Sequence, residues 1–254
     1  MRLALVILIL ASSSFAGCIY DSEEKMKINL IVEFERTNGT IVETYVGGDL
    51  ISIANASIDF HFSKTNSVLG LVEFGVEYAD GSANLTVHPD KGSMITVQFS
   101  EHGIYEIIAY AIDEKGLRVN LPVVVRMDLR MEWSESGTYN PEIMDIYPIP
   151  NNGGPYASFI VIDSTVSNPV LVQEIGGGRD VDFTWKLYDE LGDACQYRNG
   201  NVDEGESVRW KTVHFKTFES HELRISYDDG QDDIDVEQTV SIEYPHLETI
   251  PNSD

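Results

Sequence analysis

The sequence predicts an all-β protein in which two antiparallel β-sandwich modules follow an N-terminal signal segment. Apolar and polar residues alternate with the period of two that is typical of β-strands. No long segment shows the three-four spacing of an amphipathic helix. Turn-forming pairs such as Asn-Gly and Asp-Gly recur between the alternating segments, which is the pattern of short sandwich strands joined by regular turns.

Length and charge favour two modules. The chain has 254 residues, of which 43% are hydrophobic, enough for two independent cores. Its net charge of −25 disfavours nucleic acid as a partner, because phosphate backbones are repelled. Residues 18–130 contain 9 basic and 17 acidic residues, a net charge of −8, whereas residues 131–254 contain 7 and 25, a net charge of −18.

The first 17 residues have the order of a secretory signal: one cationic residue, a run of nine apolar residues, then small residues. The run is shorter than the roughly 20 residues that a membrane-spanning helix needs. It ends in Phe15-Ala16-Gly17-Cys18, which resembles a lipobox with Phe15 where Leu is usual. We expect cleavage before Cys18, lipid attachment to its thiol, and a tether over residues 18–27 that holds the protein on the extracytoplasmic face of a membrane.

Two alternatives remain for this segment. Ser14-Phe15-Ala16 is also a small-x-small site, and cleavage there would release a soluble secreted protein. The apolar run could instead stay as an uncleaved anchor. If Cys18 carries lipid, the other cysteine, Cys195, has no partner and is expected to behave as a small buried hydrophobe; if the chain is released, Cys18 and Cys195 could form a disulfide.

The alternation defines the expected modules. It is most regular from Val123 to Trp133, where apolar residues share one face and charged residues the other. We expect a first sandwich over residues 28–133, a proline- and glycine-rich linker over 134–158, a second sandwich over 159–246 and a tail over 247–254.

Two motifs in the first module resemble a PKD domain, the immunoglobulin-like polycystic kidney disease fold. The family's W-D-F-G-D-G turn stands here as Val76-Glu77-Tyr78-Ala79-Asp80-Gly81, with Val76 in place of the usual Trp. Its aromatic-x3-G-x-Y-x-V segment reads from Phe99 to Ile107 and is followed by an Asp. The resemblance implies a seven-strand sandwich of extracellular, adhesive or surface-display proteins. It also implies structural roles for Asp80, Gly81, Gly103, Tyr105 and Asp113. The alternation of the second module predicts another immunoglobulin-like sandwich.

No catalytic motif is present. The six histidines include no close pair at zinc-ligand spacing, and there is no G-x-S-x-G, H-E-x-x-H or Walker sequence. We read the Gly-rich residues 176–178 as a turn between strands. Clustered carboxylates could bind calcium, although EF-hand spacing is lacking and a solvated charged turn is the alternative. These carboxylates belong to Asp228, Asp229, Asp232, Asp233 and Asp235, and calcium is the one cofactor we consider. Sequons at Asn38, Asn55 and Asn84 could carry glycans in an exported protein.

We therefore expect a non-enzymatic surface lipoprotein for display, adhesion or the binding of an extracellular protein or carbohydrate. One alternative is an accessory or hydrolytic protein that acts on extracellular polymers. Another is a structural component of a surface layer, which would self-associate.

Overall fold

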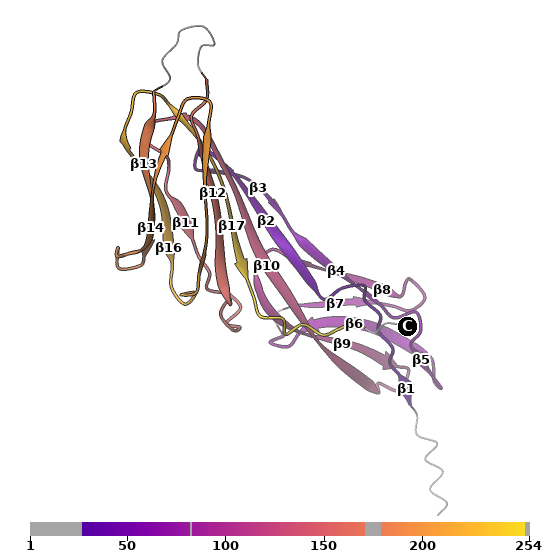
Figure 1. Ribbon diagram of the computed structural model, residues 1–254. Helices are drawn as coiled ribbons and strands as arrows, with labels where there is room; N and C mark the ends of the chain where they lie inside the picture. The colour runs from indigo at the N-terminus through magenta and orange to yellow at the C-terminus, as the bar shows by residue number, and fades with distance from the viewer. Residues whose placement is uncertain (1–26, 82, 171–178, 252–254) are drawn as a thin grey trace, which may run out of the picture.

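The computed structural model describes residues 27–81, 83–170 and 179–251. These residues form strands and turns without a helix, so the prediction of an all-β fold is confirmed. In the part of the chain described, no helix is long and apolar enough to cross a membrane. The strands gather in two sandwiches, one toward each end of an elongated molecule, and β10 (Arg118–Thr138) runs from one to the other (Figure 1).

The N-terminal sandwich has one layer in the strand order β7-β6-β9-β10 and a second layer of two short strand pairs, β4-β8 and β1-β5. Its strands besides β10 are β1 (Ile28–Asn29), β4 (Ala56–His61), β5 (Asn66–Ser67), β6 (Leu71–Tyr78), β7 (Asn84–Val87), β8 (Met94–Phe99) and β9 (Gly103–Asp113). Aromatic rings fill the space between the layers. Phe62, which follows β4, stacks on Phe74 of β6 with ring centroids 4.9 Å apart, so apolar burial joins the two layers.

The C-terminal sandwich packs the strand order β15-β12-β17-β10 against β11-β16-β13-β14. Its strands besides β10 are β11 (Met144–Ile146), β12 (Phe159–Ser167), β13 (Val181–Asp189), β14 (Ala194–Val202), β15 (Ser207–His214), β16 (His221–Asp229) and β17 (Ile234–Glu243). Trp185 of β13 is fully buried at its centre. Its indole N–H donates to the hydroxyl of Ser164 on β12 at 2.8 Å, which satisfies the polar atom of this large side chain across the core.

A hairpin of β2 (Asn38–Val46) and β3 (Asp49–Ala54) lies beside β10. β2 pairs with β10 in parallel along residues 126–134, which departs from the expected all-antiparallel arrangement. β17 pairs with residues 129–138 of β10, so β2 and β17 occupy opposite edges of this strand. β9 pairs with residues 118–127. One strand thus belongs to both sandwiches.

This continuity corrects the expected domain boundaries. The boundary between residues 133 and 134 falls inside β10, and residues 134–158 are not a free linker. They contain β11, and their prolines at 141, 148 and 150 are buried. Asn152 donates from its side-chain amide to the carbonyl of Ile104 at 2.8 Å. Prolines interrupt sheet pairing here, but the segment packs across both sandwiches and does not separate them.

Residues 247–251 of the expected tail pack against the N-terminal part of β10. Arg126 was predicted on the solvent face of its strand, yet it is buried because Glu248 lies over it. Its guanidinium donates to both carboxylate oxygens of Glu248 at 3.2 Å and also pairs with Asp128. The backbone N–H of Thr249 donates to the carbonyl of Val124, and the N–H of Val124 donates to the Thr249 hydroxyl, both at 2.9 Å, so the contact continues along β10. The carboxylate of Glu248 in the tail therefore neutralises the buried Arg126, whose charge would otherwise be costly to bury in the sandwich.

The residues of the PKD-like motifs shape turns and local packing. Gly81 has a φ of +75° in the turn after β6, and its N–H donates to the carbonyl of Tyr78 at 2.8 Å. Asp113 is buried and accepts the N–H groups of Lys115 and Leu117, both at 2.9 Å, which closes the β9–β10 hairpin. Tyr105 is half-buried, and its hydroxyl donates to the carbonyl of Glu101 at 2.6 Å.

Gly103 and Asp80 are the other two residues of the PKD-like motifs. Gly103 adopts a φ of +146°, and a Cβ there would lie 2.9 Å from the side chain of Asn152, so the position suits glycine alone. Asp80 is exposed in the turn that contains Gly81. The structure thus gives these motif residues roles in turns and packing.

The Glu248 contact makes stability depend on pH. Burial opposes ionisation of Glu248, but its hydrogen bonds from Arg126 outweigh burial and lower its pKa from 4.5 to about 2. A carboxyl with a depressed folded-state pKa stabilises the fold above its unfolded pKa, and the contribution is lost as pH falls through the folded pKa. Because its side chain is only 13% exposed, we expect Glu248→Gln to cost about 2–3 kcal/mol at pH 7. The difference from the wild type should shrink between pH 4.5 and about 2.

Urea denaturation across this pH range measures the difference. Glu132→Gln is the matched control, because the Glu132–Arg130 pair on the same strand is exposed and should contribute at most about 0.5 kcal/mol. A Glu248→Gln variant as stable as the wild type at pH 7 would show that the tail contact does not stabilise the fold.

Candidate ligand-binding cleft

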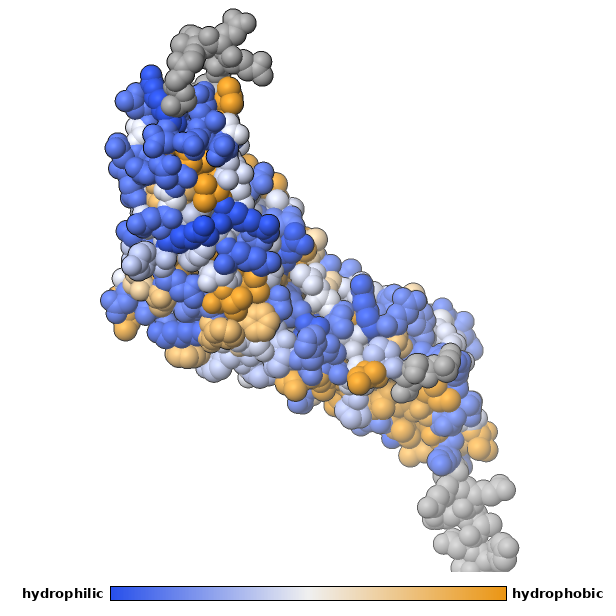
Figure 2. All heavy atoms as spheres, in the orientation of Figure 1, coloured by the Kyte–Doolittle hydropathy of each residue, from blue (hydrophilic) through white to orange (hydrophobic). Residues whose placement is uncertain are grey.

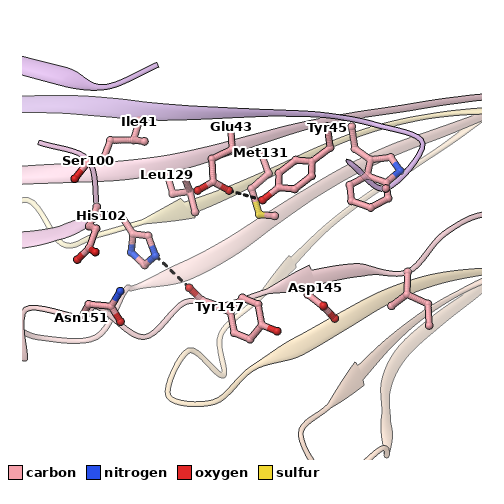
Figure 3. A pocket seen from close by; sticks show the side chains of 14 residues that line it. Ile41, Glu43, Tyr45, Ser100, His102, Leu129, Met131, Asp145, Tyr147 and Asn151 are labelled. Carbon is pink, nitrogen blue, oxygen red and sulfur yellow. Dashed lines mark hydrogen bonds between the residues drawn. The ribbon is translucent and has the colours of Figure 1, made fainter. Parts of the chain in front are cut away.

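A candidate site for a ligand lies where the β2–β10 pair meets the segment that leads into the C-terminal sandwich. It is a cleft of about 480 Å³ (Figure 3). Its lining residues are Ile41, Glu43, Tyr45, Gly48, Ser100, Glu101, His102, Leu129, Met131, Trp133, Ile143, Asp145, Tyr147 and Asn151. They come from β2, β10, the β8–β9 loop and residues 143–151, so four distant parts of the chain build one site.

The floor of the cleft follows from strand periodicity. Alternate residues of a strand share a face, and the parallel register places Ile41, Glu43 and Tyr45 opposite Leu129, Met131 and Trp133. The three β10 residues are buried in the core, so the floor is apolar and rigid. Tyr45 stacks on Trp133 with ring centroids 5.3 Å apart, which sets an aromatic surface at one end.

Hydrogen bonds fix the polar groups on this floor. The Tyr45 hydroxyl donates to Glu43 at 2.8 Å, and burial together with this carboxylate raises the pKa of Tyr45. The indole N–H of Trp133 donates to the buried carboxylate of Glu135 at 2.7 Å, and the N–H of Glu142 also bonds that carboxylate. The aromatic pair is therefore held in place before any ligand arrives.

His102 has a structural role at the opposite wall. Its Nε2 donates to the carbonyl of Tyr147 at 3.1 Å, because a carbonyl can only accept, and its Nδ1 accepts the hydroxyl of Tyr244 at 2.8 Å. Burial lowers the pKa of His102, which keeps the ring neutral. With both nitrogens bonded, His102 orients the Tyr147 segment, as Figure 3 shows.

The charged side chains that line the cleft are carboxylates, which only accept hydrogen bonds, whereas Ser100, Tyr147 and Asn151 can also donate. Glu43, Glu101 and Asp145 supply carboxylates, and Asn151 supplies an amide. Tyr147 is 63% exposed, so its ring is free for a ligand, and the neighbouring Asp145 carboxylate raises its pKa. No lysine or arginine is among the lining residues. The cleft suits a ligand that donates hydrogen bonds, offers an apolar face and carries no anionic group.

The predicted calcium site does not assemble. Within the residues that the structure describes, only Cys195, His214 and His221 bring three metal-binding atoms within 4.8 Å of one another. The aspartates of the acidic turn serve separate local bonds: Asp228 accepts from Thr184, Asp229 from Gly230 and Asp235 from Gly137. Asp228 and Asp229 are exposed, which fits the solvated-turn alternative for that part of the turn. Much of the C-terminal sandwich is hydrophilic on the face shown in Figure 2.

The other predicted residues fall in several places. Cys18 and the glycines at 176–178 lie outside the described residues. Asn55 and Asn84 are exposed, whereas Asn38 is half-buried and its amide donates to Glu248 at 3.4 Å. Cys195 is exposed, which corrects the expectation of a buried thiol. Sequence reasoning missed the cleft because its pieces are far apart, and no motif marks them.

No protein-family model and no curated protein matches the chain, so the resemblance to PKD domains is not confirmed. Among solved structures, the chain is similar to a carbohydrate-binding module of the β-sandwich superfamily, at 6% identity and a TM-score of 0.32 over 84% of this chain and 97% of the other.

Two further structures are similar at the same low level. The Bacteroides ovatus mixed-linkage glucan utilization protein SGBP-B, in complex with a heptasaccharide, has 8% identity and a TM-score of 0.22 over 80% of this chain and 52% of the other. The CBM51-2 and INT domains of Clostridium perfringens ZmpB have 9% identity and a TM-score of 0.26 over 87% and 49%. The ligand must therefore be argued from the cleft itself.

The acidic turn generates one prediction. Calcium should raise the melting temperature of the protein no more than sodium at equal ionic strength, because both ions only screen the negative charge. The double variant Asp232→Asn, Asp233→Asn should respond to the two salts in the same way as the wild type. Differential scanning fluorimetry in matched salts measures this, and a saturable shift specific to calcium that the double variant loses would restore the calcium site.

Proposed function

We propose that the protein is a non-enzymatic surface lipoprotein that binds a neutral carbohydrate in the cleft. The observation that carries the proposal is the exposed ring of Tyr147 beside a cleft whose charged side chains are all carboxylates. A sugar presents hydroxyl donors at its edge and C–H groups on its face. Carboxylates and amides bind the donors, and an aromatic ring packs against the apolar face.

The absence of cationic side chains among the lining residues narrows the ligand class. Glu43, Glu101 and Asp145 would repel a uronic acid, a sulfated sugar or a phosphate. Neutral sugars avoid this repulsion and exploit the carboxylates as strong acceptors. The same lining favours a second candidate, a cationic amine held by the carboxylates against the aromatic rings. Salt distinguishes the two, because only the binding of a cation weakens steeply as salt rises.

The first 18 residues support export and anchoring. This segment consists of a cationic residue, a nine-residue apolar run and a terminal Ala-Gly-Cys. In the described residues, β1 begins at Ile28, so about ten residues would separate a lipid on Cys18 from the first strand. We propose that this tether leaves the elongated molecule free to present its cleft outside the membrane.

Binding is tested with neutral, acidic and amino-sugar oligosaccharides by isothermal titration calorimetry. We expect a neutral oligosaccharide to bind, and Tyr147→Ala to weaken it about 30-fold, since loss of an aromatic anchor costs about 2 kcal/mol. Tyr197→Ala is the matched control, because Tyr197 is 71% exposed on β14 and lies outside the cleft. Equal affinities for the two variants would refute the cleft as the site, and strong weakening by salt would favour a cationic ligand.

Anchoring is tested by Cys18→Ser. The variant should move from the membrane fraction to the soluble or secreted fraction, because the thiol that carries the lipid is gone. Cys195→Ser, which removes the other cysteine, should stay with the membrane. Mass spectrometry of the mature N-terminus separates lipid attachment at Cys18 from ordinary cleavage after Ala16, and membrane association of Cys18→Ser equal to that of the wild type would contradict the proposal.

A further inference from the structure

A second cluster of reactive side chains lies at one edge of the C-terminal sandwich, in the strands β14, β15 and β16. Cys195 is the second residue of β14, His214 ends β15 and His221 begins β16. A sulfur and one nitrogen of each histidine lie within 4.8 Å of one another. The two imidazole rings are 4.6 Å apart at an interplanar angle of 77°.

The fold brings these residues together at the open edge of the sandwich. β14 is the edge of one sheet and β15 is the edge of the other, so no strand pairing closes the gap between them. Side chains close it instead. The amide of Gln196 donates to the carbonyl of Val213 at 3.1 Å and accepts the hydroxyl of Thr212 at 2.8 Å.

Two buried nitrogens in the cluster lack a hydrogen-bond partner. They are Nε2 of His214 and Nδ1 of His221, whose side chains belong to residues only 8% and 1% exposed. An unpartnered polar atom at this depth costs about 1–3 kcal/mol unless something binds it. A partner that reaches both nitrogens is therefore expected.

The hydrogen bonds around His221 favour a metal as that partner. Its Nε2 lies 2.6 Å from the carbonyl of Lys216 and must donate to it, because a carbonyl only accepts. A neutral imidazole that donates from Nε2 keeps a lone pair on Nδ1, which is the buried nitrogen without a partner. A carbonyl behind a histidine in this way is the usual outer-shell arrangement of a metal ligand.

His214 needs one adjustment. The amide nitrogen of Gln196 lies 3.4 Å from its Nδ1, a long contact. Zinc binding at Nε2 requires the tautomer with the proton on Nδ1, which gives up this long contact, while Gln196 keeps its bonds to Val213 and Thr212.

We propose that Cys195, His214 and His221 bind a zinc ion. One thiolate and two imidazoles form a donor set that zinc prefers, and three protein ligands leave one tetrahedral position for water. On binding, the Cys195 thiol releases its proton to solvent and a sulfur–zinc bond forms, with no change of oxidation state. The ion would join the edges of both sheets through β14, β15 and β16, and this site does not depend on the function of the cleft.

Metal titration of the full chain without an affinity tag tests the site, after treatment with a chelator and a reductant. We expect one zinc ion per chain and a higher melting temperature. Cobalt, used as a spectroscopic probe, should produce a thiolate-to-metal charge-transfer band. Cys195→Ser should abolish the band and weaken zinc binding at least about 100-fold, more than the loss of an outer-shell group. Because Cys195 is exposed, this variant should fold, which far-UV circular dichroism verifies.

Three variants complete the design. His214→Gln should weaken zinc binding in the same way. Cys18→Ser and His88→Gln are the matched controls, since neither residue belongs to the cluster, and both should bind zinc like the wild type. Zinc affinity equal in Cys195→Ser and the wild type would overturn the site, and so would stabilisation by calcium as large as that by zinc, which would indicate adsorption to the acidic surface.

Discussion

β10 imposes one constraint on both sandwiches, because its apolar alternation continues without interruption from Val123 to Trp133. The first apolar residues of this face enter the core beside β9, and the last enter the core beside β17. A strand that supplies two cores cannot change register in one sandwich without moving every side chain of the other by one position. The two sandwiches therefore share their register, and the segment between them cannot act as a hinge at residue 134.

The same strand explains the cleft. β2 runs parallel to β10 along the stretch where the partner on the opposite edge changes from β9 to β17. The N-terminal second layer ends there, and the segment around Met144 and Tyr147 only then begins to cover the C-terminal sheet. An uncovered stretch of sheet remains between the two layers, and its apolar floor and polar walls form the candidate binding site.

Much of the fold was predictable because strand faces are a local property. The alternation from Val123 to Trp133 gave the buried face correctly, and the turn at Gly81 follows from its short-range sequence. The burial of Arg126 was not predictable, because its partner Glu248 is 122 residues away. The prolines of residues 134–158 predicted a linker, because a proline cannot donate a backbone hydrogen bond to a sheet. Whether a proline ring is packed in a core depends on distant parts of the chain, which a local pattern does not show.

The sites were harder to predict for the same physical reason. Cys195, His214 and His221 have no motif spacing, and they meet because two sheet edges approach each other at the end of three strands. The five aspartates, by contrast, are close in sequence, but three of them, Asp228, Asp229 and Asp235, direct their carboxylates to separate partners. An acidic surface raises the local concentration of every cation, hard or soft. Selectivity among cations comes from the type of donor atom. Sulfur and imidazole nitrogen at the sheet edge can therefore select zinc over calcium, whereas the surrounding carboxylates attract both ions.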